Sequence, residues 1–468
     1  MNRSLLLITP FFAPQNHAAV FRAYKLAKYL PRYGWNPIVL TVDRQYEYNE
    51  DPELIRSLPP EVEIVKVRYI EPTLRGLRMA VGGRDRGFQA RKAAGALRSA
   101  GRAASGPALE AWPARAYQYL LSHYAQVPDA FWTWAQAATA AGHKLLRERQ
   151  IHLVYTTAPP YSCLEIGQAL QQTGAKWVAD FRDPIAYYRR LSSPVPRVYN
   201  QQRRIVARAL ESANALTWAA SCFGSIYSDV FGKCVPDATF IPTGIDPALL
   251  DTPDLETPSL ETPSQETPDR TGHPRPYLIF TGEFLPNYAP DFFESLAAAL
   301  GRVDLQRTGI RLLVVGTLEL NRRRMLPLIE RFGLEEHVEF RDQVPQREVY
   351  RLVSQARAGV LLPGSQARWW TNAAKMTDFI GMRKPVVAVV ADPSEARSEL
   401  TKTGLGVFLD GSVEDRARRL AEFILGEHRL PPPHPSHCDR YTVGSQVRSF
   451  ADVFDRVARA AAPNLRPC

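Results

Sequence analysis

Short apolar runs alternate with longer amphipathic stretches along most of the chain, and this alternation predicts parallel sheets with helices between their strands. At the start of the chain a proline-rich loop and a helical repeat of Val20, Ala23 and Ala27 separate two apolar runs. Helix N-termini and strand-end amides converge at the carboxyl edge of such a sheet, so ligands are expected there. Strands are predicted at 5–9, 38–42, 62–67, 153–157, 176–180, 214–218 and 238–241, and again at 277–281, 311–315, 337–340, 358–362, 385–390 and 406–409.

The alternation is interrupted near the middle of the chain. Residues 252–271 read TPDLE-TPSLE-TPSQE-TPDRT, a repeat with almost nothing to bury, which predicts a disordered linker. The expected fold class is therefore α/β with two doubly wound domains, as the length of 468 residues also suggests. The predicted divisions are a first domain at 1–248 with an inserted region at 75–135, a linker at 249–275, a second domain at 276–442 and a final helix at 443–468.

The net charge of +10 favours an anionic partner, which is a nucleic acid, an anionic membrane surface or a phosphorylated small molecule. No nucleic-acid-binding motif accompanies the charge, so no nucleic-acid partner is expected. Residues 83–102 suit peripheral contact with anionic lipid, although such a segment is more often a solvated helix. The basic side chains of this segment are Arg84, Arg86, Arg91, Lys92, Arg98 and Arg102.

The cysteines and the N-terminus bear on the cellular location. Five scattered cysteines without a CxxC pair favour a reducing cytoplasm. No apolar run approaches the roughly 20 residues that cross a bilayer, and the first residues lack the layout of a signal peptide. We therefore expect a cytoplasmic protein, either free or on the inner face of the membrane, and no metal site.

The first forty residues resemble the family-four glycosyltransferase-like proteins of bacterial polysaccharide pathways. The matching residues are Arg22, Leu26–Pro31, Gly34–Trp35 and Val39–Thr41. The resemblance implies the GT-B architecture, in which two Rossmann-like domains face each other across a cleft and the last helix crosses back to the first domain. It implies acceptor binding by the first domain and nucleotide-sugar binding by the second. The family usually has two glycines in the first loop, whereas residues 15–19 of this chain contain none. We place Asn16 and His17 of this loop on the acceptor side, together with Arg22.

Two further segments of the first half carry the resemblance. Residues 154–162 form a strand and a Pro-Pro turn that place Thr157 and Ser162 on the acceptor side. The run 180–184 reads DFRDP and is the sharpest match, so Asp180, Arg182 and Asp183 are the catalytic candidates. Their carboxylates can accept hydrogen bonds from sugar hydroxyls or take the proton of the acceptor. The alternative is an internal Asp–Arg ion pair that holds the loop.

The second half carries the donor motif of the resemblance. Relatives offer cations to the donor diphosphate after the segment that matches 280–282, whereas this chain has Glu283 and Tyr288 there. The segment 368–388 is similar to the family's donor motif, in which a helix N-terminus and a lysine meet the diphosphate. Trp370 replaces the first acid of that motif, and the second acid is kept as an aspartate. The donor-binding candidates are Gly282, Gly316, Arg368, Trp370, Thr371, Asn372, Lys375 and Asp378.

The resemblance as a whole implies a retaining glycosyltransferase that moves a sugar from a nucleoside-diphosphate sugar to a glycan or lipid-linked acceptor, with neither a metal nor another cofactor. The altered donor motif leaves a second interpretation open, a non-catalytic protein that binds a nucleotide sugar or glycan in an assembly. A sugar epimerase of the same fold is a third interpretation, since it binds a nucleotide sugar without needing an acceptor.

Overall fold

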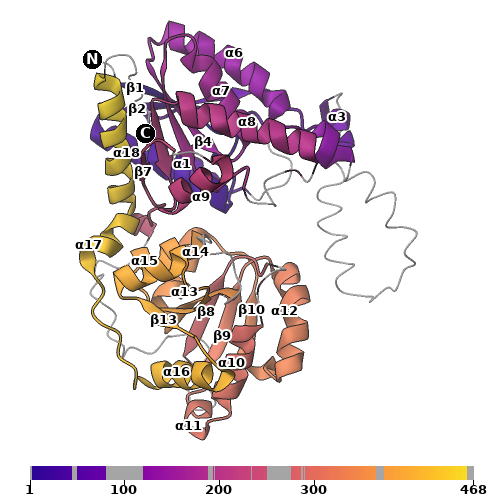
Figure 1. The fold of residues 1–468 in the computed structure, drawn as a ribbon, viewed down its shortest axis with the longest axis vertical. Coiled ribbons are helices and arrows are strands. Elements are labelled where there is room, and N and C mark those ends of the chain that lie inside the picture. The colour runs from indigo at the N-terminus through magenta and orange to yellow at the C-terminus, as the bar shows by residue number, and fades with distance from the viewer. Residues whose placement is uncertain are drawn as a thin grey trace. The chain divides into compact units, whose positions relative to one another are not determined.

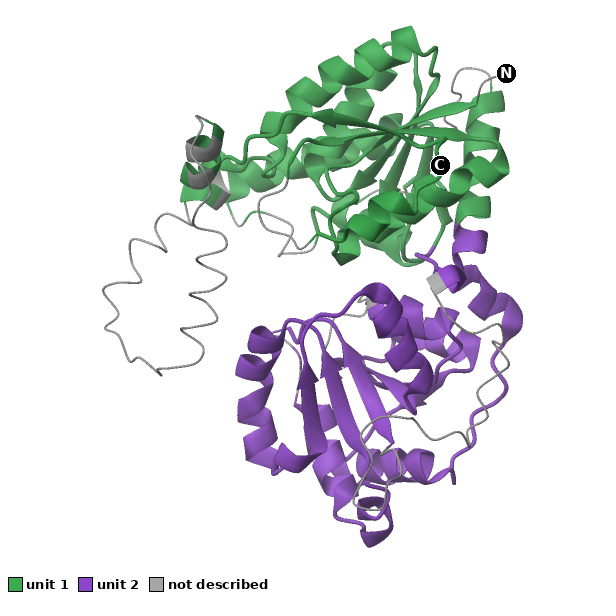
Figure 2. Cartoon of the chain, turned by 180° about the vertical axis from the view of Figure 1, so that it is seen from behind, with its two compact units in different colours: residues 1–241, 447–468 green, residues 242–446 purple. Residues whose placement is uncertain are grey.

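The computed structural model describes residues 3–44, 50–80, 120–187, 193, 195–232, 235–249, 276–285, 288, 290–364 and 374–460. The chain forms two compact units, which are residues 1–241 with 447–468 (unit 1) and residues 242–446 (unit 2), as Figure 2 shows. The predicted linker at 252–271 and the basic segment at 83–102 lie outside the described residues.

Unit 1 is built on a seven-stranded sheet in the order β3-β2-β1-β4-β5-β6-β7, and all of its strand pairs are parallel. The order reverses between β1 and β4, and ligands of open α/β sheets bind at the carboxyl edge beside such a reversal. Each predicted strand is confirmed, with bounds that differ from the prediction by at most two residues. The strands are β1 Ser4–Ile8, β2 Asn36–Val42, β3 Glu63–Val67, β4 Leu153–Ala158, β5 Lys176–Phe181, β6 Ala215–Trp218 and β7 Ala238–Phe240.

Helices cover the sheet of unit 1 on both faces (Figure 1). Side chains alternate along β4, so Thr156 accepts a hydrogen bond from the indole of Trp177 beneath α7, while Tyr155 packs against α18. The helices are α1 Ala18–Tyr29, η1 Leu30–Tyr33, α2 Pro52–Arg56, α3 Leu74–Ala80, η2 Leu121–Ala125, α6 Trp132–Glu148, α7 Tyr161–Gln171, α8 Pro196–Ser212, α9 Phe223–Phe231 and α18 Val443–Arg459.

The last helix, α18, begins in unit 2, and most of its length belongs to unit 1. Phe450 and Phe454 stack on each other and meet the ring of Tyr155 edge-on. Asp455 accepts hydrogen bonds from Trp35 and Arg3 near the start of the chain. These contacts pack the last helix against the sheet of unit 1.

Unit 2 is built on a six-stranded parallel sheet in the order β10-β9-β8-β11-β12-β13, which reverses between β8 and β11. Its predicted strands are likewise confirmed. The two sheets and their helices establish the predicted α/β fold class with two doubly wound domains. The strands are β8 Tyr277–Thr281, β9 Arg311–Val315, β10 Val338–Arg341, β11 Ala358–Gly364, β12 Val386–Val390 and β13 Gly406–Phe408.

Two apolar layers sandwich the sheet of unit 2. Leu278 and Phe280 of β8 face α10, α12 and α16, whereas Tyr277 and Ile279 face α13, α14 and α15. The helices are η3 Pro247–Leu249, α10 Asp291–Leu300, α11 Val303–Gln306, α12 Leu318–Phe332, η4 Glu335–His337, α13 Gln346–Gln355, α14 Ala374–Gly381, α15 Glu395–Thr403, α16 Val413–Leu425, α17 Pro435–Cys438 and η5 Asp439–Tyr441. Among the described residues no helix is long and apolar enough to cross a membrane.

Candidate functional site

Asp180, at the carboxyl end of β5, makes several hydrogen bonds at the edge of unit 1. Its carboxylate is fully buried and accepts hydrogen bonds from Tyr155 at 2.9 Å, Thr157 at 2.8 Å and Thr217 at 2.6 Å. Arg22 of α1 adds two parallel bonds of 2.8 and 2.7 Å. Arg22 and these hydrogen bonds hold the pKa of Asp180 below its usual value, although burial acts in the opposite direction.

Arg22 is as deeply buried as its partner, with 2% of its surface exposed. Its Nη1 donates to the carbonyl of Ile241 at 2.8 Å, and its guanidinium lies over the ring of Phe450 at 5.0 Å. These contacts favour the alternative of an internal ion pair for Asp180, and the arginine of the pair is Arg22 rather than Arg182. In this arrangement Asp180, Arg22 and Thr157 support the edge of the sheet from beneath.

Arg182 lies just beyond β5 and reaches back to the loop after β1. Its guanidinium donates to the carbonyl of Ala19 at 2.6 Å and to that of Pro159, and it lies over the ring of Phe11 at 5.5 Å. The same ring meets the imidazole of His17 edge-on at 5.2 Å. Arg182 and His17, which are far apart in the sequence, therefore gather around Phe11 at the reversal between β1 and β4.

His17 is a neutral imidazole in this cluster. Burial, with the nearby charge of Arg182, lowers its pKa to about 4. Its Nε2 lies 3.2 Å from Oε1 of Gln15, which places a proton on that nitrogen. His17 precedes the first residue of α1, and Asn16 beside it is half-buried in the same loop.

Asp183 follows Arg182 and differs from Asp180 in its surroundings. Burial raises its pKa, and the charge of Arg182 acts in the opposite direction without reversing the shift. No hydrogen bond from another described side chain lowers that pKa, in contrast to the five bonds at Asp180. A half-buried carboxylate of raised pKa at the ligand edge is suited to accept a proton.

Ser162 is fully buried and is engaged within the protein. Its hydroxyl and its backbone amide both lie 2.8 Å from the carboxylate of Asp129, which also accepts from the amide of Phe131 at 2.8 Å. Asp129 thus satisfies the free amides at the start of α7 from outside the helix. Nothing in the local sequence marks Asp129 as the partner of Ser162, which lies 33 residues further along the chain.

Lys375 lies in the donor segment of unit 2, and its amine is buried against aromatic rings. Its Nζ is buried, and no described residue accepts a hydrogen bond from it. The nitrogen lies 3.5 Å from the centroid of the Phe280 ring, at the end of β8, and 5.7 Å from that of Tyr288. Burial lowers the pKa of Lys375 to about 7. A buried amine at the carboxyl edge without a hydrogen-bond acceptor is a site that an anion would complete.

The two donor-side glycines have different roles. Gly282 has φ of +92°, and a side chain there would meet nothing within 4 Å, so its surface faces open space. Gly316 packs against Gly282, because a Cβ at Gly316 would lie 2.2 Å from the Gly282 carbonyl oxygen. Asn321 of α12 holds the loop after β8 by donating to that carbonyl and accepting from the amide of Phe284, both at 2.8 Å.

Replacing Gly316 by alanine is expected to lower the free energy of unfolding by about 1–3 kcal/mol, because the added methyl group forces the two loops apart. Gly224 in α9 is the control, since a Cβ there meets nothing within 4 Å and alanine favours a helix. Urea denaturation measures both variants. Equal stability of the Gly316→Ala variant and the unchanged protein would show that the loops yield freely.

Arg324 is a cation that the sequence did not reveal as part of this edge. Its Nη1 donates to the carbonyl of Phe284 at 2.7 Å and lies 3.9 Å from the carboxylate of Glu283. Helix α12 therefore brings a positive charge to the loop that carries Glu283. Arg324 lies one helical turn after Asn321, so the two side chains lie on the same face of α12. This spacing points to Arg324 only once Asn321 is known to bind the loop after β8.

Asp378 lies one helical turn after Lys375 in α14. Its Oδ1 accepts a hydrogen bond of 3.3 Å from the hydroxyl of Tyr350. The structure therefore brings Gly282, Lys375 and Asp378 to the carboxyl edge of unit 2, while Gly316 supports it. The other donor-side candidates, Arg368, Trp370, Thr371 and Asn372, lie outside the described residues.

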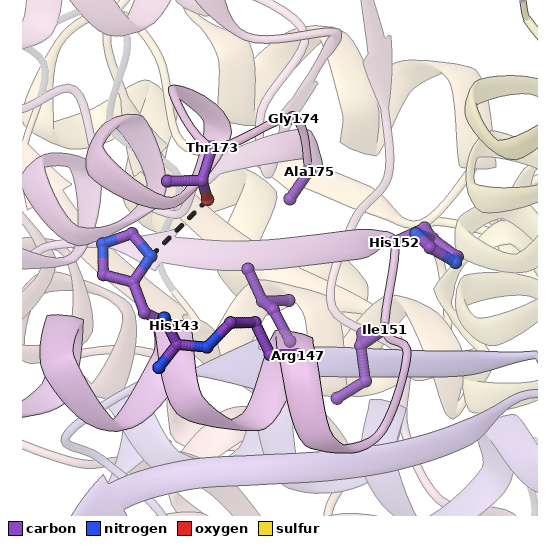
Figure 3. A pocket seen from close by; sticks show the side chains of 8 residues that line it. His143, Arg147, Ile151, His152, Thr173, Gly174 and Ala175 are labelled. Atoms are coloured by element: carbon purple, nitrogen blue, oxygen red, sulfur yellow. Dashed lines mark hydrogen bonds between the residues drawn. The ribbon is translucent and has the colours of Figure 1, made fainter.

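A pocket at the opposite edge of unit 1 is distinct from these clusters (Figure 3). It has a volume of about 290 Å³ and lies where α6 and α7 end. Helix C-termini carry partial negative charge, which explains the basic side chains and disfavours an anionic ligand there. Its lining residues are His143, Leu146, Arg147, Ile151, His152, Thr173, Gly174 and Ala175. In the part of the chain that is described, no three His, Cys, Asp or Glu side chains gather to hold a metal ion.

Comparison with solved structures identifies the architecture. A UDP-forming trehalose-phosphate synthase from Burkholderia xenovorans, solved with glucose 6-phosphate, is 15% identical, with a TM-score of 0.54 over 97% of this chain and 99% of the other. WaaG, a glycosyltransferase of lipopolysaccharide biosynthesis, is 12% identical, with a TM-score of 0.52 over 97% and 100%. A putative UDP-N-acetylglucosamine 2-epimerase from Listeria monocytogenes is 10% identical, with a TM-score of 0.52 over 99% of both chains.

The chain has the GT-B fold of these glycosyltransferases. No protein-family model matches the sequence, and no curated protein matches it. The GT-B fold alone does not decide the activity, since transferases and an epimerase share it at comparable TM-scores. The activity must be argued from the side chains at the two sheet edges.

Proposed function

We propose that this GT-B protein is a retaining glycosyltransferase that uses a nucleoside-diphosphate sugar as donor and a glycan or lipid-linked acceptor in cell-surface polysaccharide synthesis. The observation that carries the proposal is the buried ammonium of Lys375, which lacks a hydrogen-bond acceptor among the described residues at the carboxyl edge of unit 2. A donor diphosphate supplies that acceptor and the compensating negative charge.

The donor binds to unit 2 in this proposal. Lys375 holds the diphosphate, Gly282 lets the phosphates approach the backbone, and Asp378 accepts hydrogen bonds from the ribose hydroxyls. Arg324 partly compensates for the cation that Glu283 replaces. The cations Lys375 and Arg324 stabilise the leaving diphosphate, and no metal ion or other cofactor takes part in the proposed reaction.

The acceptor binds at the edge of unit 1 that carries His17, Arg182 and Asp183. The acceptor oxygen bonds to the anomeric carbon on the same face from which the diphosphate leaves, so the configuration is retained, and the bond from that carbon to the diphosphate breaks with its electron pair on the departing oxygen. Asp183 takes the proton of the acceptor hydroxyl, for which its raised pKa suits it. Asp180 acts from beneath by holding the strand end in place.

Replacing Asp183 by asparagine is expected to lower turnover at least about tenfold, which corresponds to about 1.4 kcal/mol in the barrier. Donor affinity should change less than about twofold, because Asp183 lies on unit 1 and not in the donor segment. A panel of UDP-, GDP- and ADP-sugars is tested first by calorimetry and then for transfer and hydrolysis. Glu165, another unit 1 acid whose pKa burial raises, provides the control variant Glu165→Gln.

One observation favours a second function, the binding of a nucleotide sugar or glycan without catalysis. Glu283 and Tyr288 occupy positions at which relatives place cations, and Trp370 replaces an acid of the donor motif. This second function predicts donor binding with neither transfer nor hydrolysis, and activity that appears in a Trp370→Glu variant. Conversion of the nucleotide sugar without an acceptor would instead identify an epimerase.

A further inference from the structure

Tyr350 of α13 is a fully buried residue whose hydroxyl meets the acid of the proposed ribose site. Its oxygen lies 3.3 Å from Oδ1 of Asp378 and 3.0 Å from Nε2 of Gln346. The backbone amide of Asp246 also donates to the tyrosine oxygen. All four residues belong to unit 2 and come from three segments of the chain, because Gln346 and Tyr350 lie one turn apart on α13.

The chemistry of these partners fixes the direction of each hydrogen bond. The amide nitrogens of Gln346 and Asp246 can only donate, so they occupy the lone pairs of the tyrosine oxygen. Its single proton is then left for Asp378. Burial and the carboxylates of Asp378 and Asp246 raise the pKa of Tyr350 well above its usual value, so the hydroxyl keeps this proton at any working pH.

The support behind Tyr350 is rigid. Asp246 follows Ile245, whose amide donates to the carbonyl of Tyr441 at 2.7 Å. The carbonyl of Ile245 in turn accepts from the amide of Val443 at 2.7 Å. Asp246 is itself 2% exposed, so the donor behind the tyrosine hydroxyl is fixed within the unit.

We propose that Tyr350 is a positioning residue that holds Asp378 in the orientation needed to accept hydrogen bonds from the ribose hydroxyls of the donor. This inference rests on the proposed function, in which Asp378 binds the ribose. A carboxylate that must be ordered when a ligand binds lowers the affinity for that ligand. A hydrogen bond from a buried hydroxyl orders the carboxylate before the donor binds, so less affinity is lost on binding.

The test compares UDP with 2′,3′-dideoxy-UDP, which lacks both ribose hydroxyls, by calorimetry on the full chain; GDP and its dideoxy form provide a second base. The dissociation constant of the dideoxy nucleotide divided by that of the unmodified nucleotide reports the ribose contacts alone. In the Tyr350→Phe variant this ratio is expected to fall about threefold to tenfold, while the affinity for the dideoxy nucleotide is unchanged. An unchanged ratio overturns the inference.

Tyr277→Phe is the matched control. Tyr277 is also fully buried in unit 2, but its hydroxyl donates to the carbonyl of Leu352 at 2.8 Å instead of to an acid. The ratio should stay at its original value in this variant. If Tyr277→Phe lowers the ratio as much as Tyr350→Phe does, the effect is a general loosening of unit 2 and positioning is refuted.

A second variant keeps the test independent of the folding of Tyr350→Phe. Gln346 is half-buried in the first turn of α13, where an acid suits the helix N-terminus. In Gln346→Glu the new carboxylate competes for the proton of Tyr350, so the ratio should fall as well. Retention of the full ratio in this variant contradicts the inference.

The failure of the inference is separable from that of the proposed function. If the unchanged protein distinguishes the two nucleotides and Asp378→Asn abolishes the difference, the ribose site stands whatever the result for Tyr350. If Asp378→Asn keeps the difference, Asp378 is not the ribose ligand and the inference fails with it. If the unchanged protein binds none of UDP, GDP and ADP, the proposed donor site itself is refuted.

Discussion

Replacing Asp180 by alanine is expected to lower the free energy of unfolding by about 3–5 kcal/mol, the loss measured when one partner of a buried ion pair is removed. The variant leaves the guanidinium of Arg22 buried without its counter-charge, and it leaves the hydroxyls of Tyr155, Thr157 and Thr217 without their acceptor. Urea denaturation monitored by circular dichroism measures the loss.

Two controls separate the buried pair from ion pairs in general. Lys144→Ala removes an exposed partner of Glu148 at 3.8 Å and should cost less than about 1 kcal/mol. The double variant Arg22→Met with Asp180→Leu removes both charges, so it should lose less than the sum of the two single variants. If Asp180→Ala keeps full stability and loses only turnover, Asp180 is a catalytic residue and the structural role assigned to it is refuted.

Replacing Lys375 by methionine is expected to weaken the binding of a nucleoside diphosphate by about 1–3 kcal/mol, the contribution of a hydrogen bond to a charged group. The same change should raise the free energy of unfolding, because methionine keeps the apolar contacts with Phe280 and removes an unpaired buried charge. Calorimetry with UDP and GDP measures the first effect, and chemical denaturation measures the second.

The pH dependence of binding follows from the pKa of Lys375, which burial lowers to about 7. Above this pH the free protein carries a neutral amine, so the diphosphate must bind together with a proton. Affinity should therefore fall as the pH rises above 7, by up to about tenfold per pH unit. Stability changes in the opposite direction, because the unfolded chain binds this proton more tightly than the folded one between pH 7 and the usual pKa of 10.5.

Lys384→Met is the matched control. Lys384 is also buried, and burial lowers its pKa to about 8, but its Nζ donates to the carbonyls of Ser354 and Ala356, both at 2.8 Å. Its loss should destabilise the end of α13 and leave nucleotide affinity unchanged. Equal nucleotide affinity of Lys375→Met and the unchanged protein would place the diphosphate elsewhere.

The sequence by itself determined the strands and the division into two α/β halves. Burial inside a layered fold requires apolar side chains at the spacing of each element, so runs such as 5–9 and 311–315 reveal their strands without knowledge of their neighbours. Candidate site residues could be placed at strand ends by the same logic, because the carboxyl edge follows from parallel topology. Lys375 and Asp378 were identified from a local motif and lie together on α14.

Only the tertiary structure decided which charges are satisfied within the protein. Asp180 and Arg182 are two positions apart, yet the partner of Asp180 is Arg22, 158 residues away on α1. In unit 2, Asp378 of α14 is met by Tyr350 of α13, whose buried position gave no signal in the sequence beyond that of a core residue. The physical reason is that apolar periodicity is a local property of the chain. The partner of a buried charge depends on which distant segments the fold brings into contact.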